Sequence, residues 1–134
     1  MSDMLKPGPA NGPPVILLHW LALRHLQLSS MSPALVARRV IRVIVPYVRG
    51  YGTTRFLSSE TFRNGQPSAV ALDTIAFMDA LKIQKAILAG FDWGARTADI
   101  IAALWPERCK ALVSVSGYLI GSQESGKDAV AAEG

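Results

Sequence analysis

One aspartate of the sequence stands in a setting that suits a reactive carboxylate. Asp92 lies between two aromatic residues, and glycines stand two positions before and after it, at Gly90 and Gly94. This is the G-x-Nuc-x-G spacing of a nucleophile elbow, which holds the reactive side chain on a strained turn between a strand and a helix. Small flanking residues prevent clashes in such a turn. The stretch predicts a carboxylate nucleophile, and helix capping is the alternative role for Asp92.

The residue that follows the aspartate has a part in the same prediction. Trp93 opens a segment of helical character, so its backbone N–H would point toward the site where negative charge develops in a reaction. The dipole of the helix favours negative charge at that end. We therefore expect the N–H of Trp93 to donate to an oxyanion.

Four apolar runs alternate with segments of helical length. Because each run is nearly continuous in its apolar residues, it suits a strand that is covered on both faces, as in a parallel sheet. The alternation predicts an α/β fold with a doubly wound, mostly parallel sheet of about four strands. The runs are VILLH at 15–19, RVIVP at 42–46, AILAG at 86–90 and ALVSVS at 111–116.

Two segments show the spacing of amphipathic helices, 67–82 and 94–105. The first carries an apolar stripe with Asp73 opposite it, and Pro106 is expected to end the second. The residues of the two stripes are Ala71, Ile75 and Met78, and Ala98, Ile101, Ala102 and Trp105.

A long glycine-containing loop at 47–66 follows the second apolar run. Ligands of α/β proteins meet the loops at the carboxyl ends of strands, so this loop is expected near any active site. The domain organisation that we predict is a flexible lead-in at 1–14, a partial core at 15–122 and a disordered tail at 123–134.

The composition argues against several other classes of protein. The 134 residues are 50% hydrophobic and 18% charged, which predicts a globular domain. Although the formal net charge is +4, the basic residues are scattered, so we expect no nucleic-acid partner. No apolar span of membrane length is present, so no membrane association is expected. The single cysteine, Cys109, forms no disulfide within the chain and fits a cytoplasmic location.

The stretch AGFDWGARTADIIAALWPERCKALVSVSG, together with PPVILLH and VIVPYVRGYGTTR, resembles the α/β-hydrolase superfamily. The resemblance is to its aspartate-nucleophile branch of epoxide hydrolases and dehalogenases, over the N-terminal half only. It implies that Asp92 attacks a carbon of a small epoxide or organohalide and forms an ester, and that no metal or organic cofactor is needed. Trp93 would supply one oxyanion-hole N–H, and Trp20 is the candidate for the second.

Parts of the family pattern are missing from the sequence. The histidine that activates water in this family comes late in the chain, whereas the two histidines here are His19 and His25. His19 ends the first apolar run, where the family has a structural His-Gly motif. We expect no cap domain, and Tyr47, Tyr51 and Tyr118 do not correspond to the cap tyrosines that polarise the epoxide oxygen. We therefore expect a truncated form that is inactive or limited to a single turnover.

The residues after His19 read HWLALRHLQL, where the family has H-G-x-P. With suitable codons, a shift of one base after the histidine turns this stretch into G-W-P-Y-D-I-Y-S, which contains the expected motif. The tail KDAVAAEG can be shifted in the same way to M-P-L-P-P-K. The hypothesis is that the reading frame slipped near residue 20 and again near residue 128, and the coding DNA would decide it.

A non-catalytic alternative stays open. A half-sheet exposes a strand edge and apolar faces, and such surfaces invite pairing between copies of a chain. The second hypothesis is therefore a half-domain that associates with itself through its exposed sheet edge.

Overall fold

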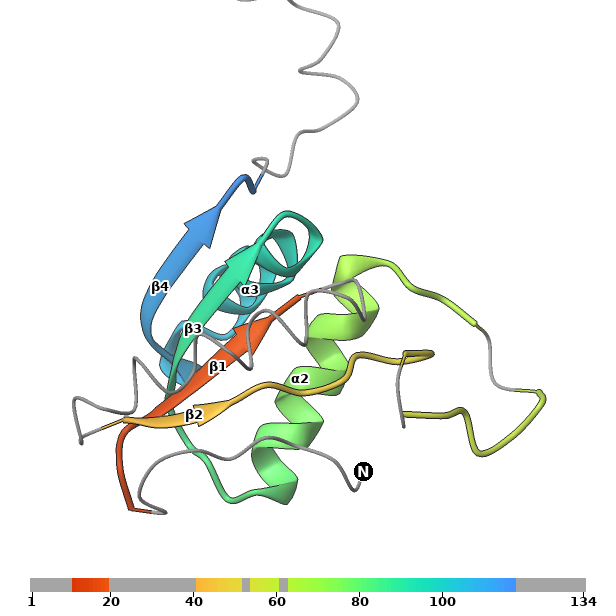
Figure 1. Cartoon of the computed structure of the whole chain (residues 1–134), viewed down its shortest axis with the longest axis horizontal. Helices are drawn as coiled ribbons and strands as arrows, with labels where there is room; N and C mark the ends of the chain where they lie inside the picture. Colours follow the sequence, from red (N-terminus) through yellow and green to blue (C-terminus); the bar gives the residue numbers. More distant parts are fainter. Residues whose placement is uncertain (1–10, 20–40, 52–53, 61–62, 118–134) are drawn as a thin grey trace, which may run out of the picture.

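The four apolar runs form a parallel sheet. The computed structural model describes residues 11–19, 41–51, 54–60 and 63–117. Within these ranges the elements follow one another in the order shown in Figure 1. They are β1 (Pro14–Leu18), β2 (Arg42–Ile44), α2 (Pro67–Ala80), β3 (Ala86–Phe91), α3 (Trp93–Leu104), the short 3₁₀ turn η1 (Pro106–Arg108) and β4 (Cys109–Val115).

Several sequence predictions fall outside the described residues. They are Trp20, His25, Tyr118, most of the lead-in, the tail at 123–134 and both proposed sites of frame slippage.

The strand order is β2-β1-β3-β4, and all three pairings are parallel. The central pair aligns Ile16 with Leu88, and β3 in turn aligns Leu88 with Leu112 of β4. The predicted parallel α/β sheet of about four strands is thus confirmed.

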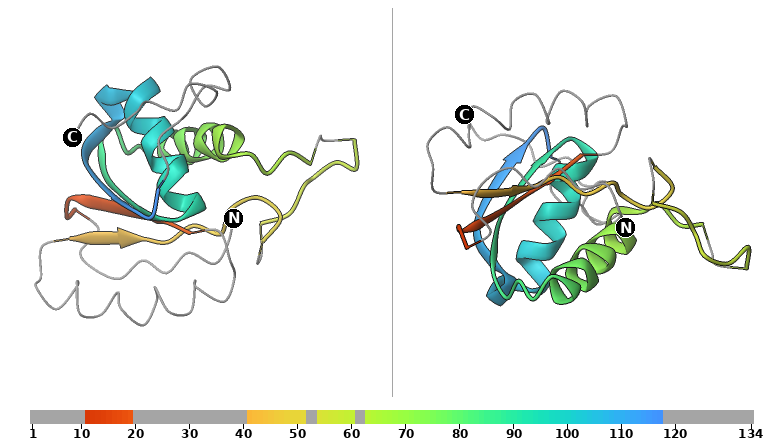
Figure 2. Two further views of the ribbon diagram at one scale, coloured as in Figure 1. Left: turned by 90° about the horizontal axis from the view of Figure 1, so that it is seen from above. Right: turned by 60° about the horizontal axis from the view of Figure 1, so that its bottom comes forward.

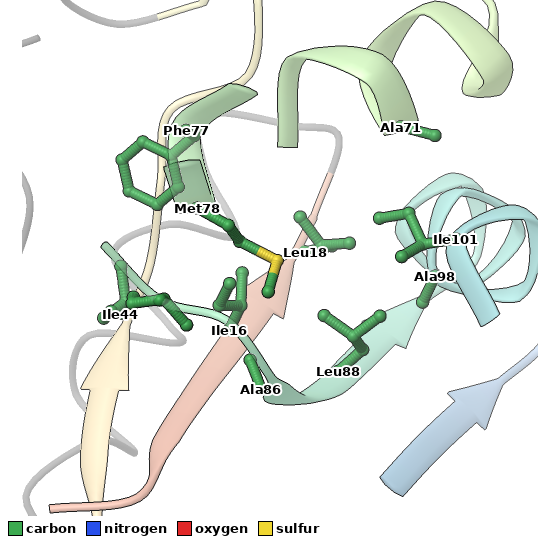
Figure 3. Packing of buried hydrophobic residues seen from close by; sticks show 11 residues of the cluster. Ile16, Leu18, Ile44, Ala71, Phe77, Met78, Ala86, Leu88, Ala98 and Ile101 are labelled. Carbon is green, nitrogen blue, oxygen red and sulfur yellow. The ribbon is translucent and has the colours of Figure 1, made fainter. Parts of the chain in front are cut away.

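Both described helices lie on the same face of the sheet, as Figures 1 and 2 show. They bury the apolar stripes that the sequence predicts: Ala71 and Met78 of α2 and Ala98 and Ile101 of α3 are fully buried. Figure 3 shows the side chain of Met78 reaching toward Ile16 and Leu18 of β1. Leu88 of β3 belongs to the same cluster and is also fully buried. The helix predictions were accurate to within two residues at each end.

The strands β1 and β2 are covered on their second face as well. Val15, Leu17, Val43 and Val45 form a separate buried apolar cluster on the side of the sheet that faces away from α2 and α3. A near-continuous apolar sequence therefore does correspond to two-sided burial in β1 and β2, as expected for a parallel sheet.

The last strand departs from that prediction. All residues of β4 after Cys109 are exposed, although the strand is as apolar as its neighbours. It ends the sheet and pairs with β3 alone among the described strands. β2 also ends the sheet, yet its Val43 and Ile44 are fully buried, so an outermost position alone does not account for the exposure of β4.

Candidate functional site

The turn between β3 and α3 is built from a single residue. β3 ends at Phe91 and α3 begins at Trp93, so Asp92 alone makes the reversal. Its backbone has φ 55° and ψ −116°, which is a sparsely populated conformation for a residue with a side chain. Holding such a conformation costs on the order of 1–3 kcal/mol, which the surrounding structure must offset.

Hydrogen bonds hold the strained residue on both sides. The N–H of Asp92 donates to the carbonyl of Val115 at 2.9 Å, which ties the turn to the end of β4. Its carbonyl accepts from the N–H of Arg96 at 3.1 Å, the first bond of α3. The sequence-predicted position of Asp92 at a strand-to-helix junction is therefore the one observed, with its backbone anchored to two elements.

The two glycines of the motif are required by close backbone packing. A Cβ at Gly90 would collide with the carbonyl of Gly94, and a Cβ at Gly94 would collide with the carbonyl of Leu18. Both obstacles are backbone atoms, so no side-chain rotation could relieve them. The G-x-D-x-G spacing thus lets the start of α3 lie directly against the ends of β3 and β1.

The side chain of Asp92 does not cap the helix. It precedes the first residue of α3, where a capping aspartate would accept a hydrogen bond from the first turn, but it makes no such bond. The capping alternative that the sequence left open is therefore not adopted. The carboxylate lies half-buried at the positive end of the dipole of α3, which favours a negative charge there.

The residue that directly follows Asp92 is an exposed aromatic. Trp93 is 39% exposed, and the guanidinium carbon of Arg96 lies 4.4 Å from the centroid of its ring. A contact of this kind is a cation–π interaction, which favours one placement of the indole. The sequence analysis did not single out Arg96. The available signal was its position three residues after Trp93, which places both on the same side of a helix.

Of the two other residues predicted near the site, the structure describes His19 but not Trp20. His19 follows β1, is 2% exposed, and its backbone nitrogen lies 3.0 Å from where a Cβ of Gly94 would be. The end of β1 therefore adjoins the turn at Asp92. Trp20, the candidate second oxyanion donor, lies outside the described residues.

Arg49 fastens the predicted loop to α2. Its guanidinium forms two 2.6 Å bonds to the carboxylate of Asp73 and a 3.0 Å bond to the carbonyl of Asn64. The hydrogen bond to Asp73 raises the pKa of Arg49. Thr54 adds a bond within the loop by donating to the carbonyl of Tyr47 at 2.8 Å.

A cavity of about 470 Å³ lies between this loop and α2. Phe56 and Phe77 are among its lining residues, whereas Asp92 and Trp93 are not. The sequence placed the loop near the active site, and the cavity that the loop forms is separate from the turn at Asp92.

The described residues contain neither a metal-binding cluster nor a membrane-spanning helix. In these parts of the chain no three histidine, cysteine, aspartate or glutamate residues are grouped so that they could hold a metal ion. None of the helices described here has the length and apolar character that spanning a membrane requires.

Known proteins resemble this chain over most of its length. The model of the alpha/beta hydrolase fold family matches residues 13–130. Epoxide hydrolase 3 of Siraitia grosvenorii is 39% identical over 121 residues, which covers 82% of this chain and 34% of that protein. Epoxide hydrolase B of Mycobacterium tuberculosis is 32% identical over 117 residues, covering 83% of this chain and 30% of that protein.

A solved structure shares both fold and sequence with the chain. A crystal structure from Klebsiella pneumoniae, of a protein named as a candidate epoxide hydrolase, superimposes with a TM-score of 0.83 at 61% identity. The match covers 93% of this chain and 41% of that one. The chain thus spans about a third of the length of the curated relatives that it matches.

Proposed function

Since this chain belongs to the alpha/beta hydrolase fold family, we propose that it carries the nucleophile half of an epoxide-hydrolase-like site, with Asp92 as the nucleophile. The observation that carries the proposal is the backbone of Asp92, held at φ 55° and ψ −116° with no capping bond from its side chain. Strain of this kind gathers at functional sites, because ordinary folding gives no reason to retain it. The similarity to epoxide hydrolases supports the choice of substrate.

The first step forms an ester. A carboxylate oxygen of Asp92 attacks one ring carbon of the epoxide, and the bond from that carbon to the ring oxygen breaks. The electron pair of that bond passes to the ring oxygen, which then takes a proton from a water molecule, leaving hydroxide, and becomes a hydroxyl group. The product of this step is a hydroxyalkyl ester of Asp92, and no metal or organic cofactor takes part.

The second step returns the carboxylate. Water adds to the ester carbonyl, an oxyanion forms on the oxygen of that carbonyl, and the diol leaves. Trp93 is the residue that we assign to stabilise the oxyanion through its backbone N–H, since it begins α3 directly after the nucleophile. Trp20 is proposed as the second donor.

The second step also needs a base that removes a proton from the attacking water. Neither histidine of the sequence is assigned this role: His19 is buried after β1, and His25 has no counterpart in the family pattern. We therefore propose that these 134 residues perform the alkylation and that the ester accumulates in them.

The experiment is a time course of the intact mass of the 134-residue chain with a small aryl epoxide. A Cys109→Ser background is used because a free thiol also reacts with epoxides. The expected result is a gain of the mass of one epoxide per chain, with diol formed in no more than one equivalent. The matched variant Asp92→Asn in the same background should remain unmodified.

Two other results would change the assignment. A gain in the mass of the chain with an alkyl halide but not with the epoxide, together with release of an equal amount of halide, would favour the dehalogenase alternative. Equal modification of the Asp92→Asn variant, or no modification of either protein, would overturn the assignment of Asp92 as the nucleophile. It would favour the non-catalytic, self-associating alternative.

A further inference from the structure

The cavity between the loop and α2 has the size of a small-molecule site. Its volume is about 470 Å³, and pockets that hold small ligands measure roughly 300–1,000 Å³. Its lining comes from residues 46–49 and 54–57 of the loop and from α2 between Val70 and Phe77. Figure 1 shows the chain running past α2 after it leaves β2, so a single stretch of chain and one helix form both walls.

Apolar side chains make up much of this lining. Val48, Val70 and Phe77 are 7%, 2% and 6% exposed, so they form a wall that is already packed against the core. Phe56 adds a second, half-buried aromatic ring from the loop, and Leu57 beside it is fully exposed. An occupant of the cavity with an apolar body would remove these two loop side chains from water, which favours its binding.

Most of the polar side chains of the lining are already bonded within the protein. The carboxylate of Asp73 accepts two 2.6 Å bonds from Arg49. The hydroxyls of Thr54 and Thr74 donate to main-chain carbonyls, each at 2.8 Å. Arg55 differs from them, because it is exposed and forms no hydrogen bond or ion pair with any residue that the structure describes.

The charges of the lining leave an excess of one positive charge. Two arginines stand against one aspartate, and the pair of Arg49 and Asp73 neutralises itself. The guanidinium of Arg55 is therefore the group that an anion would meet at this cavity. A guanidinium presents a planar fork of N–H donors that matches the two oxygens of a carboxylate.

We propose that this cavity binds a small organic carboxylate with an aromatic body. Its ring packs against Phe56 and Phe77, since aromatic pairs gain more than their buried area alone provides. Its carboxylate accepts hydrogen bonds from Arg55. The site is separate from the candidate nucleophile, because Asp92 does not line the cavity.

The test is a titration of the isotope-labelled 134-residue chain, followed by NMR, with 2-naphthylacetate. Its neutral amide, 2-naphthylacetamide, has nearly the same shape and serves as the matched ligand. The acid should bind with a Kd of roughly 0.1–1 mM, as expected for a ligand of this size. The amide should bind roughly three-fold to ten-fold more weakly, because it lacks the charge. The shifted resonances should cluster at 46–57 and 70–77.

Two results of this titration would overturn the proposal. The first is the absence of saturable shifts at millimolar acid, and the second is a set of shifts centred outside the cavity. Equal affinities of the acid and the amide would overturn the assignment of an anion. Added salt should weaken the acid and leave the amide unchanged, since it screens the exposed guanidinium.

A charge variant tests the role of Arg55. Arg55→Gln should lower the affinity for the acid to about that for the amide, a loss of roughly three-fold to ten-fold, and leave the amide unaffected. Arg63→Gln removes the same charge from an exposed loop position that does not line the cavity, so it should change neither affinity. Equal losses in both variants contradict a specific contact with Arg55.

A second variant fills the cavity from the side of α2. Ala76 lines it and is exposed, so Ala76→Phe adds a ring there without disturbing the core, and binding of both compounds should fall by roughly ten-fold or more. Leu72→Phe places the same ring at another exposed position of α2 that does not line the cavity, and binding should persist. Binding that survives Ala76→Phe would overturn the location.

The Asp92→Asn variant separates this site from the proposed reaction. It should bind 2-naphthylacetate with unchanged affinity, because the carboxylate of Asp92 takes no part in the cavity. Binding is measured without any covalent step, so a failure of Asp92 to form an ester leaves the expected result unchanged. Loss of binding in Asp92→Asn would place the ligand at the turn and overturn a separate site.

Discussion

Leu88 and Leu112 are partners in neighbouring strands of the same sheet, yet their surroundings differ completely. Leu88 of β3 is fully buried among residues of α2, α3 and β1, whereas Leu112 of β4 is 41% exposed. Both strands are apolar in sequence, and both run parallel to their neighbours. The difference shows that an apolar strand sequence does not by itself set how deeply the strand is buried in this protein.

The comparison extends to the ends of the two strands. The carboxyl end of β3 leads into the turn that positions Asp92. At Gly90 and Gly94 this turn packs directly against backbone atoms. The carboxyl end of β4 supports that turn from outside through the bond between Asp92 and Val115. β3 thus presents the candidate nucleophile, and β4 contributes one anchoring hydrogen bond.

Alanine substitutions of glycine should show the largest difference in stability between the carboxyl ends of β3 and β4. Gly90→Ala drives a methyl group into the backbone of Gly94 and should lower the free energy of unfolding by about 4 kcal/mol. Gly117→Ala meets only the side-chain tips of Ser114 and Asp99 and the methyl group of Ala95, so it should cost about 1 kcal/mol or less. Urea unfolding at low protein concentration measures both, and similar losses would contradict the comparison.

Truncating the two partner leucines tests burial directly. Leu88→Ala removes side-chain volume from the packed layer and should destabilise the chain by about 3 kcal/mol. Leu112→Ala should cost less than about 1 kcal/mol in the monomer. The same unfolding measurement applies, and a large loss in the monomeric Leu112→Ala variant would mean that β4 is covered in solution.

The amino ends of the two strands are joined by Arg108. Its guanidinium donates to the carbonyls of Gln84 and Ile83 at 2.8 and 3.1 Å and to the carboxylate of Asp79 at 2.7 Å. Arg108→Ala should cost about 1 kcal/mol, chiefly from the carbonyl bonds. The side chain of Asp79 is 63% exposed, so Asp79→Asn should cost under about 0.5 kcal/mol. Equal losses in both variants would show that the ion pair is the stronger contribution.

The smallest effect is expected at Cys109, the part of β4 that is half-covered. Burial raises the pKa of the Cys109 thiol above that of a free cysteine. A raised folded-state pKa gives stability that is full below about pH 8.5 and is lost as pH rises through the folded-state value. Alkylation by iodoacetamide should therefore set in at higher pH in the folded chain than in urea. Onset at the same pH would contradict burial of this end.

The features that could be predicted from the sequence are those that depend on local spacing. The pattern around Asp92 gave the strand-to-helix turn, and the apolar stripes gave α2 and α3. The positive φ of Asp92 is consistent with the motif but is a property of the folded backbone. Trp93 was proposed as an oxyanion donor from its position after the aspartate, and that role stays a prediction.

The features that could not be predicted depend on contacts between distant residues. The hydrogen bonds from Arg49 to the carboxylate of Asp73 join residues that are 24 positions apart in the sequence, and no spacing rule relates the two. The exposure of β4 was predicted wrongly because an apolar run does not indicate whether other elements cover the faces of the strand. That depends on packing between elements far apart in the sequence.

The central claim, that Asp92 is a nucleophile, is tested most directly by locating the adduct within the chain. The Cys109→Ser protein would be incubated with an aryl epoxide, digested and sequenced by tandem mass spectrometry. The account predicts the added mass on Asp92, in the peptide that carries Trp93, and its loss in the Asp92→Asn variant. Added mass distributed over other carboxylates such as Asp73, Asp79 and Asp99, with Asp92 no more reactive than they are, would contradict it.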